Sequence, residues 1–192
     1  MNSYMKRKER VILTAIDIIS DLGFQGLTTK EICRRQEISD GTLYKHFRSK
    51  DEIILGVLDY YSKFDKSIKD TTELNKFSAK ESIIFFFKMI SEYYENYPSI
   101  SAISNNYETL QHEANISEKA KEIFQSRSRL IIRYIEKAKE NGELRSDIDS
   151  EGFADIILGG VRETILKWRM YNFNFSLKEK VISNIDMLLK MC

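Results

Sequence analysis

The sequence predicts an all-α protein. Three observations support this: there is one proline among 192 residues, there are only eight glycines, and apolar residues recur every three or four positions along most of the chain. No alternating apolar and polar run flanked by turn residues indicates a β-strand. We therefore expect long helices, divided between an N-terminal three-helix domain of residues 1–48 and a larger helical domain of residues 49–192.

The first helix is expected to run from near Tyr4 to Leu22, because apolar residues recur there with helical spacing. Gly23 follows and should end the helix. Residues 1–50 hold ten Lys or Arg against six Asp or Glu, whereas the rest of the chain has a slight excess of acidic residues. This balance suits a polyanionic partner for the N-terminal part alone. A solvated charged face is the alternative for the basic residues that begin the helix.

The second expected helix begins at Thr28 and Thr29. Thr28 can cap its first turn, and Glu31, three residues later, completes the pattern of a capping box. Ile32 gives the helix an apolar anchor. Glu37 lies in the turn that follows, where a left-handed backbone would cost a non-glycine residue on the order of 1 kcal/mol.

A third, short helix is expected over residues 40–47, with Ser39 as its N-terminal cap. Leu43 and Phe47 are four positions apart, so they share one face of the helix and can be buried together. Their burial turns the polar and aromatic side chains between them toward solvent. This layout is typical of a helix that enters the major groove of DNA.

The order and spacing of the residues in this region resemble those of the tetracycline-repressor (TetR) family of bacterial transcription regulators. The resemblance covers about a quarter of the chain and rests on Gly23, Gly26, Thr28, Thr29, Ile32, Ser39, Gly41, Thr42, Leu43, Tyr44, His46, Phe47 and Lys50. It implies an N-terminal helix-turn-helix domain and a C-terminal helical domain that binds an effector and forms a homodimer. Gln36 and Glu37 replace the alanine and glycine that are usual in the family.

The resemblance also implies which side chains contact an operator in double-stranded DNA. Phosphates are the expected partners of one group, Thr28, Thr29, Tyr44 and Lys50. Base edges are the expected partners of a second group, Lys30, Thr42, Lys45 and His46. Ser39 and Gly41 complete the set of expected DNA-binding residues.

Further helical segments are expected after residue 49. Ser49 and Glu52 form another capping-box pattern, which predicts that a helix begins there. Residues 70–78 are predicted to be a polar connection. Helical patterns then cover about 79–96, a shorter segment opened by Pro98, and about 117–141, 151–171 and 177–190.

The last two expected helices are the most apolar pair. Large apolar residues recur along them, namely Phe153, Ile157, Val161, Ile165, Trp168, Leu177, Val181, Ile185, Leu188 and Leu189. Gly159 and Gly160 lie mid-helix, where glycine costs roughly 1 kcal/mol relative to alanine, and the close approach of a partner helix would explain them. The resemblance implies that residues 151–190 form a four-helix bundle with a second subunit. The alternative is that these faces close the core of a single chain.

Nothing in the sequence indicates an enzyme, a cofactor or a metal site. Cys33 and Cys192 are the only cysteines and the chain has two histidines. Glu108 and His112 are four positions apart, but two ligands make a poor metal site, and a surface ion pair is the favoured interpretation. No glycine-rich phosphate loop occurs, and no apolar run is long enough to span a bilayer. The chain is therefore expected to be soluble and cytoplasmic, without a membrane partner.

The expected function is that of a ligand-responsive DNA-binding regulator, a repressor released from its operator by a small and largely apolar effector. The first candidates for the effector pocket are Phe86, Tyr94, Phe124, Arg162 and Trp168. Arg162 could hold the acidic head of a fatty acid or an acyl thioester, or it could pair with acidic side chains instead. The alternative function is an architectural or division-coupled DNA-binding factor of the same fold without an effector.

Overall fold

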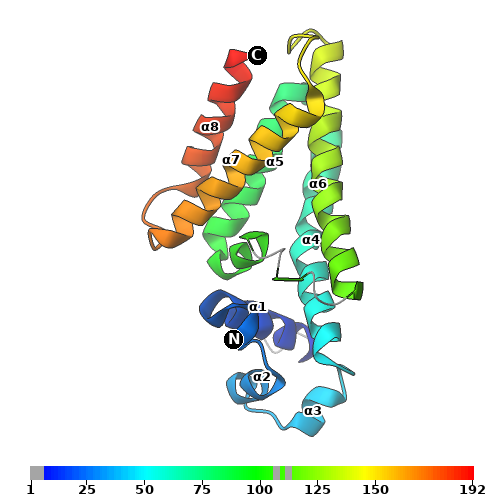
Figure 1. Ribbon diagram of the computed structural model, residues 1–192, viewed down its shortest axis with the longest axis vertical. Helices are drawn as coiled ribbons and strands as arrows, with labels where there is room; N and C mark the ends of the chain where they lie inside the picture. The colour runs from blue at the N-terminus through cyan, green and yellow to red at the C-terminus, as the bar shows by residue number, and fades with distance from the viewer. Residues whose placement is uncertain (1–6, 106–108, 111–113) are drawn as a thin grey trace. The chain divides into compact units, whose positions relative to one another are not determined.

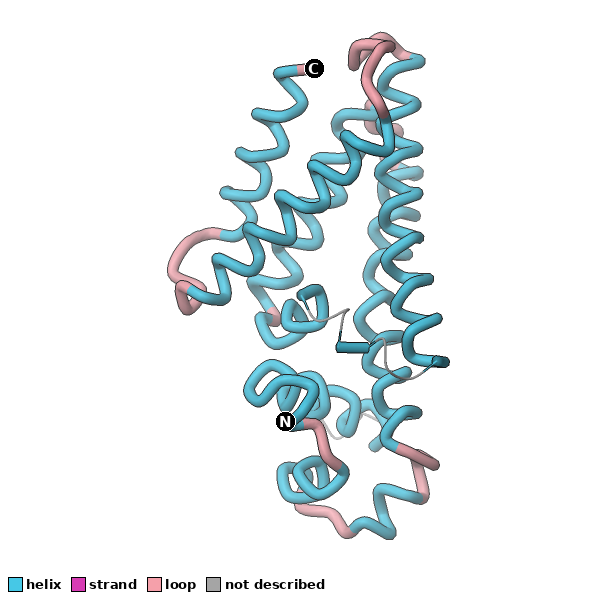
Figure 2. The backbone as a smooth tube through the Cα atoms, viewed as in Figure 1, coloured by secondary structure: helices cyan, strands magenta, loops and turns pink. Residues whose placement is uncertain are grey.

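The computed structural model describes residues 7–105, 109–110 and 114–192 (Figure 1). Within these ranges all regular elements are helical and no β-strand occurs (Figure 2), so the all-α prediction is confirmed. The elements are α1 (Arg7–Gly26), α2 (Thr29–Gln36), α3 (Asp40–Tyr44), α4 (Lys50–Leu74), α5 (Ala79–Asn96), the 3₁₀ helix η1 (Pro98–Asn105), α6 (Ala114–Glu140), α7 (Ser150–Met170) and α8 (Leu177–Met191). Tyr4, Glu108 and His112 lie outside the described residues.

The chain divides into two compact units. The first comprises residues 1–63 and 98–121, and the second comprises residues 64–97 and 122–192. Helices α4 and α6 each contribute residues to both units, because both helices extend across a point of division. The domain boundary that the sequence motifs predict after residue 48 stays a prediction.

Helix α1 supplies much of the core of the first unit. Its apolar stripe is buried, and Val11, Ala15 and Ile16 have no exposed surface. The helix contacts both α2 and η1. Gly23 was predicted to end α1; it interrupts the helix with φ 69° and ψ 177°, and the helix then resumes as far as Gly26. Glycine adopts this positive φ without the strain that a Cβ would cause.

Helix α4 is longer than the sequence predicts. The predicted polar connection over residues 70–78 is wrong in its first part, because α4 continues to Leu74 and only residues 75–78 lie outside it and α5. Thr71 and Thr72 are accommodated in the helix because each hydroxyl donates a hydrogen bond of 2.8 Å to the carbonyl oxygen four positions earlier. Thr72 is also buried, so it belongs to a packed face of the helix.

In the second unit, α8 packs against both α5 and α7. All three helices contribute buried apolar side chains, among them Ile83, Phe86, Phe153, Ile157, Val181 and Ile185. The predicted segments 79–96, 151–171 and 177–190 agree with α5, α7 and α8 to within one residue at each end. The helical spacing of apolar residues was therefore sufficient to predict these elements.

Two glutamates cap helices from distant positions in the sequence. Glu143, in the loop between α6 and α7, accepts hydrogen bonds of 3.2 and 2.9 Å from the backbone amides of the first two residues of α5. Glu95, near the end of α5, accepts hydrogen bonds from Ser176 Oγ (3.0 Å) and from the backbone amide of Lys178 (3.1 Å) at the start of α8. Each carboxylate thereby satisfies groups in a first helical turn, which have no partner within their own helix.

The apolar stripes of α7 and α8 face the interior of the single chain. All ten stripe residues that the sequence singles out are buried, except the half-buried Leu188. These faces therefore close the core of the single chain, which is the alternative that the sequence left open, and the dimer through residues 151–190 stays a prediction. Gly159 and Gly160 have only open space where a Cβ would stand, so no other helix among the described residues approaches them closely. The apolar residues that α7 and α8 leave largely exposed are Ile156 (58%), Met170 (72%), Met187 (56%) and Met191 (73%).

Replacing Glu143 by Gln should destabilise the protein by about 1 kcal/mol at neutral pH, the usual loss when a helix cap is weakened. Burial alone would raise the pKa of Glu143, but hydrogen bonds from the Lys80 backbone and from Asn141 outweigh it, so the pKa is lowered from its ordinary 4.5. A carboxylate with a lowered pKa stabilises the fold above its unfolded-state pKa, and this contribution is lost as the pH falls through the folded value.

Urea unfolding from about pH 7 to about pH 3 would measure this difference. The free energies of unfolding of the wild type and of Glu143→Gln should become equal at low pH. Glu140→Gln changes an exposed glutamate at the end of α6 and serves as the matched control, for which little pH-dependent difference is expected. A difference for Glu143→Gln that stays constant over the whole range would contradict the capping role.

Candidate nucleic-acid interface and ligand pocket

An ion-pair network around Glu31 holds α2 in place. The Glu31 carboxylate accepts hydrogen bonds from Arg34 (2.7 and 2.8 Å) and from Arg35 (2.8 Å), and Arg35 also pairs with Asp21 of α1 at 2.7 Å. The hydrogen bonds from Arg34 and Arg35 lower the pKa of Glu31 to about 2. Thr28 Oγ1 accepts a hydrogen bond from the Glu31 amide at 3.1 Å, as predicted. The predicted capping box is only half formed, because the arginines engage the carboxylate instead.

The turn between α2 and α3 contains a left-handed residue. Glu37 has φ 52° and ψ 44°, a conformation that costs a non-glycine residue roughly 1–2 kcal/mol. Side chains tie down both sides of the turn: Gln36 Nε2 donates to Thr14 Oγ1 of α1, and Cys33 Sγ donates to Asp40 Oδ1 at 3.2 Å. Burial, with a smaller contribution from Asp40, raises the pKa of the Cys33 thiol to about 11. The turn is thus held by contacts that offset its backbone strain.

Helix α3 presents one buried and one exposed side. Ser39 caps it as predicted, with its Oγ accepting a hydrogen bond from the Thr42 amide at 3.2 Å. Leu43 and Phe47 are each 1% exposed, whereas Tyr44 between them is 53% exposed. The helix ends at Tyr44, earlier than the predicted end at Phe47, and a turn follows. The exposed side chains after Tyr44 therefore lie on a turn and not on a continuing helix.

The other predicted DNA-binding residues lie at the start of α2, on α3 and just beyond it. Those that are exposed are Thr28, Lys30, Ser39, Gly41, Lys45, His46 and Lys50, whereas Thr29 and Thr42 are half-buried. The Thr42 hydroxyl lies 3.0 Å from the Ser39 hydroxyl, so it already has a partner within the chain. Exposed ammonium, hydroxyl and imidazole groups on a small helical unit can supply contacts to phosphates and base edges. The individual contacts stay predictions.

The five predicted effector residues all belong to the second unit, but their environments differ. Three of them are at most 2% exposed, namely Phe86, Tyr94 and Trp168. Phe124 is 42% exposed, and the guanidinium carbon of Arg162 lies 5.5 Å from the centroid of its ring. Trp168 packs against Phe173 with the ring centroids 4.6 Å apart. The set thus includes three core residues and one cation–π pair at the surface.

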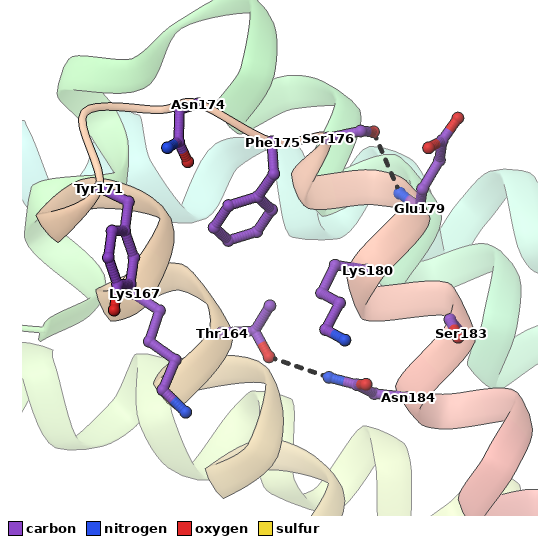
Figure 3. A pocket seen from close by; sticks show the side chains of 10 residues that line it. All are labelled: Thr164, Lys167, Tyr171, Asn174, Phe175, Ser176, Glu179, Lys180, Ser183 and Asn184. Atoms are coloured by element: carbon purple, nitrogen blue, oxygen red, sulfur yellow. Dashed lines mark hydrogen bonds between the residues drawn. The ribbon is translucent and has the colours of Figure 1, made fainter.

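A pocket of about 670 Å³ lies between the C-terminal half of α7, the loop that follows and the N-terminal half of α8 (Figure 3). It is lined by Thr164, Lys167, Tyr171, Asn174, Phe175, Ser176, Glu179, Lys180, Ser183 and Asn184. None of the five predicted effector residues lines it. Sequence reasoning missed this pocket because its lining residues come from two helices and the loop between them, and only the packing of α7 against α8 brings them together.

The described residues contain no group of three or more His, Cys, Asp or Glu side chains that could hold a metal ion. In the same part of the chain, no helix is long and apolar enough to cross a membrane. Two features remain as candidate binding sites. One is the set of exposed cations and hydroxyls around α3, and the other is the aromatic, partly cationic pocket between α7 and α8.

Two family matches together cover nearly the whole chain. Residues 11–57 match the family described as bacterial regulatory proteins, tetR family. Residues 53–191 match the family described as YsiA-like protein, C-terminal region. The chain belongs to the TetR family. TetR-family proteins are transcriptional regulators and not enzymes; they bind DNA operators and small-molecule effectors, and dimerisation is typical of them.

Similar proteins match this TetR-family chain over most of its length. The fatty acid metabolism regulator protein of Bacillus subtilis is 21% identical over 196 residues, which cover 96% of this chain and 97% of that protein. The crystal structure of FadR from Bacillus subtilis in complex with stearoyl-CoA has a TM-score of 0.81 at 19% identity and covers 94% of this chain and 96% of that chain. Thermus thermophilus FadR in complex with lauroyl-CoA has a TM-score of 0.64 at 22% identity, with 95% and 93% covered. At these identities the structures show a shared fold.

Gly41 allows a test of the DNA interface that leaves the TetR fold intact. A Cβ at this position would meet only Ser39 Oγ at 3.9 Å, so packing within the chain does not require glycine. Gly41→Ala should leave the free energy of unfolding unchanged or raise it by up to about 1 kcal/mol, the difference in helix propensity. Close approach of the α3 backbone to DNA would make the added methyl group clash, and we expect operator binding to weaken at least about tenfold, or 1.4 kcal/mol.

Urea unfolding measures the first effect, and fluorescence anisotropy with a duplex selected from random DNA by the wild-type protein measures the second. Gly142→Ala is not a suitable control, because Gly142 has φ 70° and any side chain there is strained. Ser126→Ala, at an exposed position of α6 that the proposals assign to no contact, is the better control. Full operator affinity of Gly41→Ala would show that DNA does not approach the α3 backbone here.

Proposed function

We propose that this TetR-family protein is a homodimeric repressor that a fatty acid or its acyl thioester releases from DNA in the cytoplasm. In this proposal residues 1–48 bind DNA, and residues 49–192 bind the effector and form the dimer. The observation that carries it is the burial of Leu43 and Phe47, which leaves Tyr44, Lys45 and His46 exposed beside a capped helix-turn-helix. An architectural or division-coupled factor without an effector has less support, because the relative from Bacillus subtilis that matches over nearly the full length is a fatty acid metabolism regulator.

The proposed DNA contacts divide by chemistry. Phosphate oxygens are the partners of Thr28, Thr29, Tyr44 and Lys50, and base edges are the partners of Lys30, Thr42, Lys45 and His46. The exposure of Lys30, Lys45 and Lys50 supports these contacts, because an ammonium group needs access to reach a phosphate or a base edge. The Thr42 hydroxyl is hydrogen-bonded to the Ser39 hydroxyl. To contact a base it must form a second hydrogen bond or break the one to Ser39.

Lys50→Ala should weaken binding to all duplexes alike, since a phosphate contact adds affinity regardless of sequence, and the slope of log K against log salt should fall by about one. Lys45→Ala should instead reduce the preference for the operator, by about 1–3 kcal/mol. Anisotropy titrations from about 50 to about 200 mM salt, with the selected operator and with a random duplex, would measure both effects. Full affinity of both variants across the titration would refute these contacts.

The proposed effector is a largely apolar molecule with an acidic head. Two of the similar structures contain stearoyl-CoA and lauroyl-CoA, which are acyl thioesters with anionic head groups. In this chain, the buried aromatic side chains of Phe86, Tyr94 and Trp168 supply apolar surroundings in the second unit. Arg162 is exposed above Phe124, where its guanidinium can form paired hydrogen bonds with a carboxylate or phosphate. These observations support an acidic head at Arg162 and an apolar tail in the aromatic surroundings.

Lauroyl-CoA and laurate should quench the emission of Trp168, the only tryptophan, and should weaken operator binding. Arg162→Ala should reduce both responses about tenfold, the loss of a charge-assisted pair worth about 1.4 kcal/mol. Arg145→Ala is the matched control, because Arg145 is exposed and pairs with Asp147 in the loop between α6 and α7. A screen in which neutral or cationic hydrophobes act and acidic ones do not would contradict the proposed acidic head.

The proposed dimer uses the side of α7 and α8 that faces away from the buried stripes. Ile156 of α7 and Met187 and Met191 of α8 are more than half exposed. Gly159 and Gly160 leave open space on the same helix as Ile156, which would allow a helix of a second copy to approach closely. Exposed apolar side chains on these two helices, with two glycines on α7, support a helix–helix contact, because they offer both area to bury and room for the partner backbone.

Ile156→Asp should give a folded monomer that no longer binds the operator, because one carboxylate from each copy would enter the contact. Ile185→Asp should instead unfold the chain, since Ile185 is 1% exposed in the core. Ile156→Leu keeps the apolar area and should remain dimeric. Sedimentation velocity and far-UV circular dichroism would separate these outcomes, and a folded wild type that sediments as a monomer would refute the proposed dimer.

A further inference from the structure

Lys8 joins the first turn of α1 to a distant part of the first unit. The sequence left phosphates or solvent as the surroundings of the basic residues that begin α1. In the structure, the Lys8 ammonium group donates a hydrogen bond of 3.1 Å to Glu52 Oε1 of α4, 44 residues later in the chain. The same nitrogen lies 5.0 Å from the centroid of the Phe47 ring. Lys8 therefore contacts the residues on both sides of the turn that precedes α4.

Glu52 holds that turn from the α4 side. Its second carboxylate oxygen, Oε2, accepts a hydrogen bond of 2.7 Å from the backbone amide of Arg48, and its own amide donates to Ser49 Oγ at 3.2 Å. The hydrogen bond from Arg48, followed by that from Lys8, lowers the pKa of Glu52 from its ordinary 4.5. The carboxylate is therefore ionised at neutral pH, with one oxygen bonded to the turn and the other to α1.

The connection between α3 and α4, residues 45–49, lies among the expected DNA-binding side chains. It carries Lys45 and His46, and Lys50 directly follows it; all three are exposed. Phe47 is 1% exposed, so the ring beside the Lys8 ammonium group belongs to the core of the first unit. One ion pair and one ring contact thus tie the start of α1 to the α3–α4 connection.

The ion pair is too exposed to matter much for global stability. The side chain of Lys8 is 55% exposed and that of Glu52 is 36% exposed, so water screens their attraction. Recognition is more demanding, because hydrogen bonds to base edges need side chains that are held to within about 0.5 Å. A contact that adds little to the free energy of unfolding can therefore still decide where Lys45 and His46 lie.

We propose that Lys8 and Glu52 are positioning residues for DNA recognition, whose ion pair sets where the α3–α4 connection presents its DNA-binding side chains. Lys8 acts through Glu52 and Phe47, and not through a phosphate contact of its own. This role rests on the proposed function, because it requires the first unit to bind an operator. It adds the first turn of α1 to the parts of the chain that determine operator preference.

Removing the two charges separately tests this role, because the two changes shift the net charge in opposite directions. Lys8→Met keeps the apolar stem of the side chain but removes a positive charge, whereas Glu52→Gln removes a negative charge. Simple attraction to a polyanion would make Glu52→Gln bind DNA more tightly. A positioning role instead predicts that both variants weaken operator binding, by about three- to tenfold.

Matched controls make the same changes in charge at neighbouring positions. Asp51→Asn removes a negative charge from the exposed residue before Glu52, and Arg7→Met removes a positive charge from the exposed residue before Lys8. Glu52→Gln should bind the operator at least about threefold more weakly than Asp51→Asn. Lys8→Arg keeps the charge and should bind the operator as the wild type does.

The preference for the operator separates positioning from a phosphate contact. In anisotropy titrations with the selected operator and a random duplex, Lys8→Met and Glu52→Gln should lose affinity mainly for the operator, whereas Arg7→Met should affect both duplexes alike. The double variant should bind no more weakly than the weaker single variant, because both changes break the same ion pair. Thermal unfolding checks that each variant is folded at the temperature of the titration, and Lys8→Gln or Glu52→Ala replaces a variant that is not.

Three outcomes would overturn the positioning role. In the first, Glu52→Gln binds the operator as tightly as Asp51→Asn. In the second, Lys8→Met loses affinity equally for both duplexes, which would assign Lys8 to a phosphate. In the third, the losses add in the double variant, so that the two residues act independently. A wild-type protein that selects no duplex from random DNA would instead refute the proposed DNA-binding function, and the positioning role with it.

Discussion

The backbone amides that begin a helix need partners, and in the second unit these partners come from carboxylates far away in the sequence. Glu143 reaches the start of α5 from the loop after α6, and Glu95 reaches the start of α8 from the last turn of α5. These hydrogen bonds hold α5 at both ends. They also place the start of α8 beside the last turn of α5. The burial along α5, α7 and α8 depends on this alignment, because a helix displaced by one turn would bring different residues to the shared face.

The same capping interaction reaches the ligand pocket. Ser176 lines the pocket, and its hydroxyl donates to Glu95, so the end of the loop between α7 and α8 is tied to α5. Phe175 is the neighbour of Ser176 in the chain, so its backbone lies next to this attachment point. In the first unit the strained turn at Glu37 is stabilised in a comparable way, by side chains from α1 and α3 on either side of it. In both places polar contacts between elements, and not the local backbone alone, fix the position of functional side chains.

The sequence was sufficient to predict the helices and the burial of Leu43 and Phe47, because both follow from the spacing of apolar residues within one element. It was not sufficient to predict what a buried face packs against. Ile185 and Val181 have the spacing of an apolar stripe whether the partner is α5 of the same chain or a helix of another copy, and the structure shows that the same chain covers them. The extension of α4 through Thr71 and Thr72 places two threonines inside a helix, where Thr72 is buried by packing that composition does not reveal. The pocket combines residues from two helices and a loop, so no single segment carries a signal for it.

The hydrogen bond from Cys33 to Asp40 has a consequence for the reactivity of the protein toward oxidants and alkylating reagents. With a pKa of about 11, the Cys33 thiol has about a hundredfold less thiolate at neutral pH than a thiol with the ordinary value of 9.0. The thiolate is the nucleophile that attacks peroxides and maleimides, so a smaller thiolate fraction slows the covalent modification of Cys33 beside this turn. The other cysteine, Cys192, follows the end of α8, far along the chain from α3. A thiol-directed fluorophore can therefore be attached there, so that the motion of α8 is followed while the helix-turn-helix stays chemically unmodified.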